Sequence, residues 1–172
     1  MTLNELNTLS ASDASDWFQQ TCAAQSWIYS MVNGRPLNTA NDVKEYAKTA
    51  WSKCGKDDFL EAFTAHPMIG DVDSLRKKFA NTKTIASGEQ SGTASASEAT
   101  LLTLKEANQA YLDKHGFIFI ICATGLSADA MLNALQTRLP NSTDEEIRTA
   151  AQEQIKITLL RIDKALTAKD EN

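Results

Sequence analysis

The sequence holds few of the residues that build disulfide frameworks or metal sites. Its 172 residues include only 3 cysteines and 2 histidines. Cys22, Cys54 and Cys122 are odd in number and widely spaced, which favours reduced thiols over a disulfide framework. Neither a Cys-x-x-Cys nor a His-x-x-x-His pattern occurs, so we expect no metal site. Reduced thiols are typical of the cytoplasm, where we expect the protein to be located.

The chain also lacks the features that indicate nucleic-acid, membrane or nucleotide binding. A net charge of -5 leaves no basic stripe to neutralise phosphates. No apolar run approaches the ~20 residues that a membrane helix needs, and the N-terminus does not resemble a signal peptide. The 7 glycines form neither a Walker nor a dinucleotide-binding signature. We therefore expect no nucleic-acid partner, no membrane association and no cofactor.

Helical spacing of apolar residues is abundant. Between residues 17 and 31 they recur mainly at three and four positions, and the pattern stops at Asn33-Gly34. A continuous apolar run, Phe117–Ala123, predicts one short buried extended segment, with a buried helical turn as the alternative. The sequence therefore predicts an all-α fold: one domain over residues 1–172, built as a bundle of about seven to nine helices.

His66 stands where a helix is forced to stop. The preceding residues, Lys56–Thr64, have helix-like apolar spacing. Pro67 lacks an N–H group and disfavours helical geometry at the residue before it. A titratable imidazole on such a stiff backbone suits proton transfer near neutral pH, and a helix-capping role is the alternative.

A long polar loop over residues 81–97 follows, rich in serine, threonine, glycine and alanine. Long loops in a helical domain tend to be functional, although a plain linker is the alternative. Ser87, Glu89, Gln90 and Ser91 supply a density of hydrogen-bonding groups that would suit a polar ligand. We therefore expect this loop to belong to an active site.

The C-terminal region predicts a last long helix. Thr143 and Glu146 have the spacing of a capping box, which predicts the start of that helix. Arg161 lies further along it. Taken alone, Arg161 would be expected to form a surface ion pair with Asp163 or Glu153.

Four motifs occur in order along the chain: His66-Pro67-x-Ile69-Gly70, Glu89-Gln90, Gly116-Phe117-x-Phe119-Ile120 and Lys156-x-x-Leu159-x-Arg161. Together they resemble the 2-oxo-4-hydroxy-4-carboxy-5-ureidoimidazoline (OHCU) decarboxylases of uric acid degradation, over nearly the whole chain. That family is all-helical, cofactor-free and commonly dimeric. The resemblance implies a carboxy-lyase that converts OHCU to S-allantoin and carbon dioxide as a homodimer. A helical protein-interaction module, or a lyase or hydrolase acting on a related ureide, is the alternative.

The resemblance also implies a role for each matching residue. His66 falls on the family's proton donor, and Glu89 on a glutamate needed for activity, so both are expected to be catalytic. The family often has serine where this chain has Ala86, so either Ser87 substitutes from a shifted loop or that hydrogen bond is missing. The residues expected to contact substrate, with 121–124 acting through their backbone, are Pro67, Ser87, Gln90, Ile121, Cys122, Ala123, Thr124 and Arg161.

Overall fold

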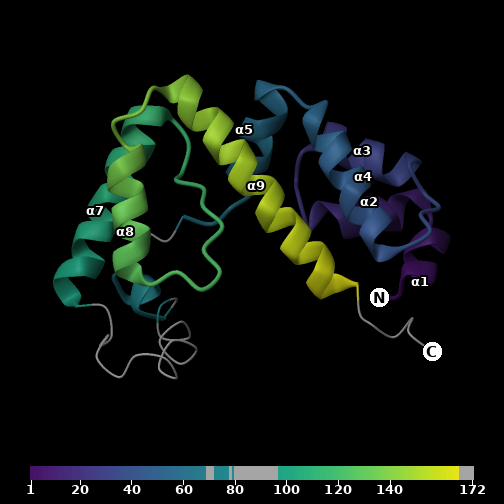
Figure 1. Ribbon diagram of the computed structural model, residues 1–172, viewed down its shortest axis with the longest axis horizontal. Coiled ribbons are helices and arrows are strands. Elements are labelled where there is room, and N and C mark those ends of the chain that lie inside the picture. Colours follow the sequence, from purple (N-terminus) through teal and green to yellow (C-terminus); the bar gives the residue numbers. More distant parts are fainter. Residues whose placement is uncertain (69–71, 78, 80–96, 167–172) are drawn as a thin grey trace. The chain divides into compact units, whose positions relative to one another are not determined.

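The computed structural model describes residues 1–68, 72–77, 79 and 97–166, and all regular secondary structure in these residues is helical (Figure 1). This confirms the all-α fold predicted from the apolar spacing. Residues 72–77 form a helical segment in addition to the longer helices. These are α1 (Leu3–Thr8), α2 (Ala11–Gln19), α3 (Gln25–Asn33), α4 (Ala40–Ser52), α5 (Lys56–Thr64), α7 (Glu98–His115), α8 (Ala128–Arg138) and α9 (Thr143–Ala165).

Side-chain caps set where many of the helices begin. Thr2 and Thr39 each form a capping box with the carboxylate three residues further on, Glu5 and Asp42 respectively. Each cap satisfies a backbone N–H that the helix geometry leaves without a partner. The equivalent bond at the starts of α2, α7 and α8 is accepted by the side-chain hydroxyls of Ser10, Ser97 and Ser127, respectively.

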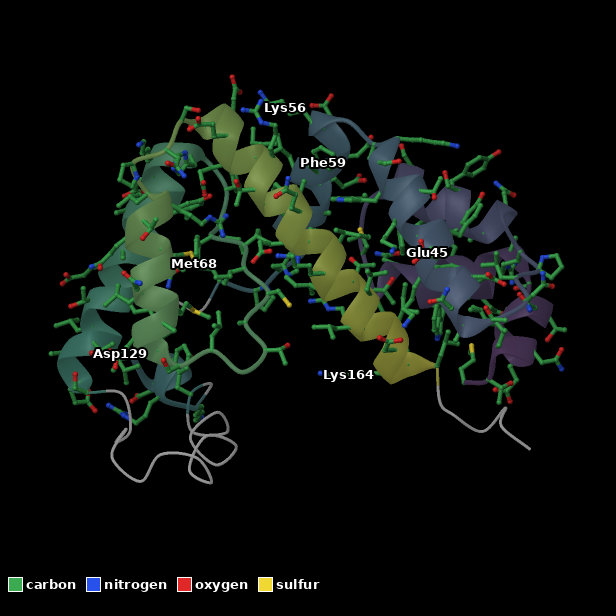
Figure 2. The ribbon with its side chains drawn as sticks, in the orientation of Figure 1. Glu45, Lys56, Phe59, Met68, Asp129 and Lys164 are labelled. Carbon is green, nitrogen blue, oxygen red and sulfur yellow. The ribbon has the colours of Figure 1, made fainter. Side chains whose placement is uncertain are left out.

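The chain divides into two compact units. The first comprises residues 1–65 and 149–172, and tryptophans lie in its core. The fully buried Trp27 donates its indole N–H to the Ala47 carbonyl, at 3.1 Å, and joins α3 to α4. Trp51 donates to the Ala151 carbonyl of α9 at 2.9 Å, and its ring centroid lies 4.7 Å from that of Phe59 on α5 (Figure 2). Trp27 and Trp51 are core, as their spacing indicates, and Phe59 is half-buried.

The apolar spacing between residues 17 and 31 covers two helices, not one continuous helix. Residues 20–24 separate α2 from α3, and within this break Thr21 and Cys22 are buried. Periodicity does not reveal the break because apolar residues on both sides keep helical spacing.

The second unit comprises residues 66–148, and in it α7 and α8 pack side by side in the same direction (Figure 1). Near their starts the Thr100 hydroxyl donates to Asp129, at 3.0 Å. Near their ends Lys114 Nζ donates to the Leu139 carbonyl, at 2.8 Å. The chain between two parallel neighbours must return along their length, which is the course of residues 116–127.

At each end of the returning segment lies a glycine whose backbone angles are in the left-handed region. Gly116 (φ +79°) ends α7, and its N–H donates to the Leu112 carbonyl at 2.8 Å. Gly125 (φ +78°) lies before α8. Both angles favour glycine because a Cβ would be strained there. Between them Phe117 and Ile120 are buried outside any helix, which confirms the short non-helical apolar segment.

Candidate active site

His66 follows directly after the end of α5. The helix stops at Thr64, Ala65 is its C-cap, and His66 lies in a bend with its side chain half-buried. Pro67 is exposed. The helix therefore ends where the His66-Pro67 pair predicts, and the imidazole is placed by backbone that cannot continue the helix.

Four residues of the polar loop fall outside the described residues. These are the catalytic candidate Glu89, the binding candidates Ser87 and Gln90, and Ala86. Their contribution to the site stays a prediction.

The predicted substrate-contacting segment, Ile121–Thr124, lies in the non-helical return between α7 and α8. The side chains of residues 121–123 are half-buried, and Thr124 is exposed. The N–H of Leu126 donates to the carbonyl of Ala123 at 3.0 Å, with Gly125 at the third position of this turn. A positive φ at that position is the geometry of a type II turn, so the backbone of the segment leads into a fixed corner.

Arg161 is directed at the break between α2 and α3. Its Nη1 donates to the carbonyl of Thr21, at a long 3.4 Å. The hydroxyl of Thr158 donates to the same carbonyl at 3.2 Å and accepts from Gln154 Nε2 at 3.1 Å. One carbonyl therefore orients two side chains of α9, and the guanidinium keeps further N–H groups for other acceptors.

The two carboxylates expected to pair with Arg161 form ion pairs with lysines instead. Asp163 pairs with Lys44 of α4, with N and O 3.1 Å apart, and Glu153 pairs with Lys156, at 2.6 Å. The interpretation of Arg161 as half of one of these surface pairs is therefore wrong. Asp163 and Glu153 lie two and eight residues from Arg161, outside the spacing of three or four that brings helical side chains together. Lys156 has that spacing from Glu153, and Lys44 reaches Asp163 from another helix.

The second unit contains a buried charged cluster that the motifs did not reveal. Glu146 of α9 is fully buried and accepts from the hydroxyl of Tyr111, at 2.6 Å. The same carboxylate accepts from Nε of Arg138, at 2.8 Å, and from Nδ2 of Asn141, at 3.0 Å. Arg138 also donates from Nη1 to the carbonyl of Ile120, at 2.7 Å. The cluster therefore ties α7, α8 and α9 to the non-helical segment.

The electrostatics of this cluster favour the ionised pair. Burial by itself would raise the pKa of Glu146, but hydrogen bonds from Tyr111, Asn141 and Arg138, with the Arg138 charge, hold that pKa below its ordinary value. Burial raises the pKa of Tyr111, and its bond to Glu146 raises it further. Tyr111 is thus a firm donor and Glu146 a firm acceptor near neutral pH.

The predicted capping box at Thr143 and Glu146 is wrong by one residue. Ser142 caps α9 instead: its hydroxyl accepts from the N–H of Glu145, at 3.2 Å, and Glu145 accepts from the N–H of Ser142, at 3.1 Å. The hydroxyl of Thr143 lies 2.9 Å from Nδ1 of His115, the last residue of α7. Two adjacent hydroxyls and two adjacent glutamates offer the same spacing, and the shift by one residue leaves Glu146 free to point inward.

Burial decides the reactivity of two cysteines. Burial raises the pKa of both Cys22 and Cys54 to about 11, with the charge of Asp58 adding to the effect at Cys54. At pH 8 only about one thiol in a thousand would be ionised. We expect both to resist iodoacetamide in the folded protein and to react in urea, as read by peptide mass spectrometry. Modification of Cys22 at the same rate in both states would contradict the buried placement.

The described residues lack two kinds of feature. No group of three or more His, Cys, Asp or Glu side chains among them is arranged to hold a metal ion. Within the same residues, no helix has the length and apolar character needed to cross a membrane.

The candidate residues are divided between the two units. His66, Pro67 and residues 121–124 belong to the second, and Arg161 belongs to the first. Their convergence on one substrate, together with the polar loop, stays a prediction.

Comparison with known proteins identifies relatives over most of the chain. The family model described as OHCU decarboxylase matches residues 7–163. A protein of Arabidopsis thaliana, "Uric acid degradation bifunctional protein TTL", is 36% identical over 157 residues, which are 90% of this chain and 48% of that protein. The chain thus spans about half the length of this relative. The "2-oxo-4-hydroxy-4-carboxy-5-ureidoimidazoline decarboxylase" of Haloferax volcanii is 25% identical, covering 94% of both chains.

Solved structures agree with these matches. The chain is similar to a crystal structure of OHCU decarboxylase in the presence of (S)-allantoin, with a TM-score of 0.70 and 34% identity, covering 88% of this chain and 96% of that one. It shares its fold with a crystal structure of (S)-allantoin synthase, at a TM-score of 0.72 and 19% identity, covering 96% of this chain and 54% of that one. The resemblance seen in the four motifs is confirmed, and this chain belongs to the OHCU decarboxylase family.

Proposed function

We propose that this protein decarboxylates OHCU to (S)-allantoin and carbon dioxide in uric acid degradation, without a cofactor. The observation that carries the proposal is the 34% identity to an OHCU decarboxylase solved in the presence of (S)-allantoin, over 96% of that chain. The family model supports it, because it spans residues of both compact units. We accordingly propose that residues 1–172 act as one catalytic domain.

The reaction does not need a cofactor to take up the electron pair, because the substrate can delocalise it. When the bond to the carboxylate breaks, its electron pair stays on the substrate and delocalises into the adjacent carbonyl and imide system, and carbon dioxide leaves. The same electron pair then takes up a proton at the carbon that becomes the stereocentre. The protein has to orient the substrate, stabilise developing charge and deliver that proton to one face.

His66 is the proposed proton donor. Its position after α5, next to Pro67, places the imidazole on stiff backbone, which favours delivery to a single face. Glu89 would accept hydrogen bonds from the N–H groups of the substrate and hold the imidazole in one tautomer. Ser87 and Gln90 would bind the polar edges of the ring, together with the backbone of residues 121–124.

Arg161 is the proposed partner of the substrate's negative charge. Its guanidinium is already oriented by the Thr21 carbonyl and can present two parallel N–H groups to a carboxylate or an oxyanion. Because the carboxylate is the leaving group, this contact would fix the direction in which carbon dioxide departs.

Arg161→Gln is expected to lower kcat/KM for OHCU by about 100-fold, since a charged two-pronged contact is lost. This loss should appear chiefly as a higher KM, with a smaller change in kcat. The matched control is Lys164→Gln, which removes an exposed positive charge from the same helix (Figure 2) and should stay within about twofold of wild type. Equal effects of the two substitutions in steady-state kinetics would show that only net charge matters.

The assembly and the location of the protein are proposed on separate grounds. A homodimer is proposed from the resemblance to a commonly dimeric family. A cytoplasmic location is proposed because Cys22, Cys54 and Cys122 are all free thiols.

The test of the function uses freshly generated OHCU, which is incubated with the purified protein while circular dichroism follows the allantoin formed. We expect rapid loss of OHCU and an excess of the S enantiomer over the spontaneous reaction. Allantoin and allantoate serve as alternative substrates, and turnover of either in place of OHCU would assign the protein to another ureide. An OHCU rate equal to that of the spontaneous reaction would overturn the proposal.

A further inference from the structure

Arg138 connects the rigid helices of the second unit to the non-helical segment beside them. It is the last residue of α8, and its Nη1 donates to the carbonyl of Ile120 at 2.7 Å. Its guanidinium carbon also lies 4.4 Å from the centroid of the Phe119 ring. Two consecutive residues of the segment are therefore held by one side chain, one through its backbone and one through its ring.

Arg138 is itself held in place. Its Nε donates to Glu146, at 2.8 Å, and only 11% of its side chain is exposed. Glu146 is fixed in turn by Tyr111 of α7 and by Asn141. These bonds fix the plane and the position of the guanidinium. Its hydrogen bond to the segment is therefore made by a rigidly held donor.

A stabilising role alone gives a poor account of this arrangement. Taking two charges out of water costs so much that apolar side chains of similar volume often serve stability equally well. An apolar pair, however, has no donor for the Ile120 carbonyl. What Arg138 supplies specifically is a directed hydrogen bond to one backbone group.

That backbone group immediately precedes Ile121–Thr124. We propose that Arg138, braced by Glu146 and Tyr111, is a positioning residue that fixes the backbone of Ile121–Thr124 for substrate binding. The proposal rests on the proposed function, in which this backbone contacts OHCU. The segment is then held at two points: by Arg138 at Ile120 and by the turn at Gly125.

Arg138→Lys tests the proposal because it keeps a cation beside Glu146 while a single ammonium cannot reproduce the fork that holds both partners. We expect kcat/KM for OHCU and the affinity for (S)-allantoin each to fall by about tenfold or more, since small misplacements of binding groups are costly. Hydrogen exchange should become faster at the amides of residues 118–124.

The matched control is Ser142→Ala, which removes the cap of α9 without touching the cluster. It should lower the melting temperature of the protein while kcat/KM, allantoin affinity and exchange in residues 118–124 stay at wild-type values. If the two variants lose activity in proportion to their loss of melting temperature, Arg138 is only structural and the proposal is overturned.

The proposal and the proposed function fail differently. A wild-type protein that does not turn over OHCU contradicts the function, whatever Arg138 does. Wild-type turnover with an Arg138→Lys variant of unchanged kcat/KM, allantoin affinity and exchange overturns the positioning role alone. If the lysine variant proves unstable, Tyr111→Phe removes one brace and keeps the ion pair. This variant should show smaller losses of kcat/KM and allantoin affinity and a smaller rise of hydrogen exchange in residues 118–124. A Tyr111→Phe variant without these changes also counts against the proposal.

Discussion

His66→Ala is expected to lower kcat/KM for OHCU by about 10²–10⁴-fold, the usual contribution of a positioned general acid. The loss should lie in kcat, because proton delivery belongs to the transition state and not to substrate binding. The measurement is OHCU turnover followed by circular dichroism of the allantoin product. The product formed in the slow residual reaction should lose its excess of the S enantiomer, since no group then protonates one face selectively.

The control for His66 is Thr64→Ala, two residues earlier. Thr64 is exposed at the end of α5, and its hydroxyl donates to the carbonyl of Glu61 at 2.7 Å. This variant should keep wild-type kcat and show how far the end of α5 can be disturbed without affecting catalysis. A folded His66→Ala protein with near wild-type kcat would reject His66 as the proton donor.

The parts of the fold that the sequence predicts well are those decided within a few residues. Pro67 stops α5 through its own missing N–H, so the break next to His66 is visible in the sequence. The starts of α2 and α8 are visible for the same reason, since Ser10 and Ser127 cap the amides three residues on. The start of α9 is harder only because Ser142 and its neighbour offer the same cap.

The sequence does not predict contacts between residues that are distant along the chain. Arg161 reaches the carbonyl of Thr21, 140 residues away, in a break that the apolar spacing does not reveal. Arg138 reaches Ile120 because α7 and α8 run parallel and the segment that joins them returns along their length (Figure 1). No motif spacing encodes either contact, because the acceptor in both cases is a backbone carbonyl. The family motifs identify candidate site residues, but not the groups that orient them.

Glu146→Ala is expected to lower the free energy of unfolding by about 3–5 kcal/mol, the usual cost of breaking a buried ion pair by removing one partner. The substitution leaves the Arg138 charge buried beside Phe119 and removes the acceptor of the Tyr111 hydroxyl. Urea denaturation measures the loss. Replacing both partners, as Arg138→Met with Glu146→Leu, should recover part of it because no uncompensated charge remains.

The same carboxylate predicts how stability depends on pH. The pKa of Glu146 is held below its ordinary value in the folded protein, so ionised Glu146 contributes stability above the pKa of an unfolded glutamate, about 4.3. That contribution is lost as the pH falls through the lowered value. Glu146→Gln cannot ionise, and its unfolding free energy should therefore decline less steeply than that of the wild type between about pH 5 and pH 3.

The adjacent Glu145 provides the control that separates burial from helix position. It also lies in the first turn of α9, but it is exposed, and within the part of the chain that the structure describes its carboxylate accepts only the N–H of Ser142. Glu145→Ala should cost about 0.5–2 kcal/mol, the range of a lost capping interaction. Equal losses for the two alanine variants would mean that Glu146 acts only through its place at the helix start. A larger loss for Glu146, partly recovered by the apolar pair, would instead locate the cost in the unpaired charge of Arg138.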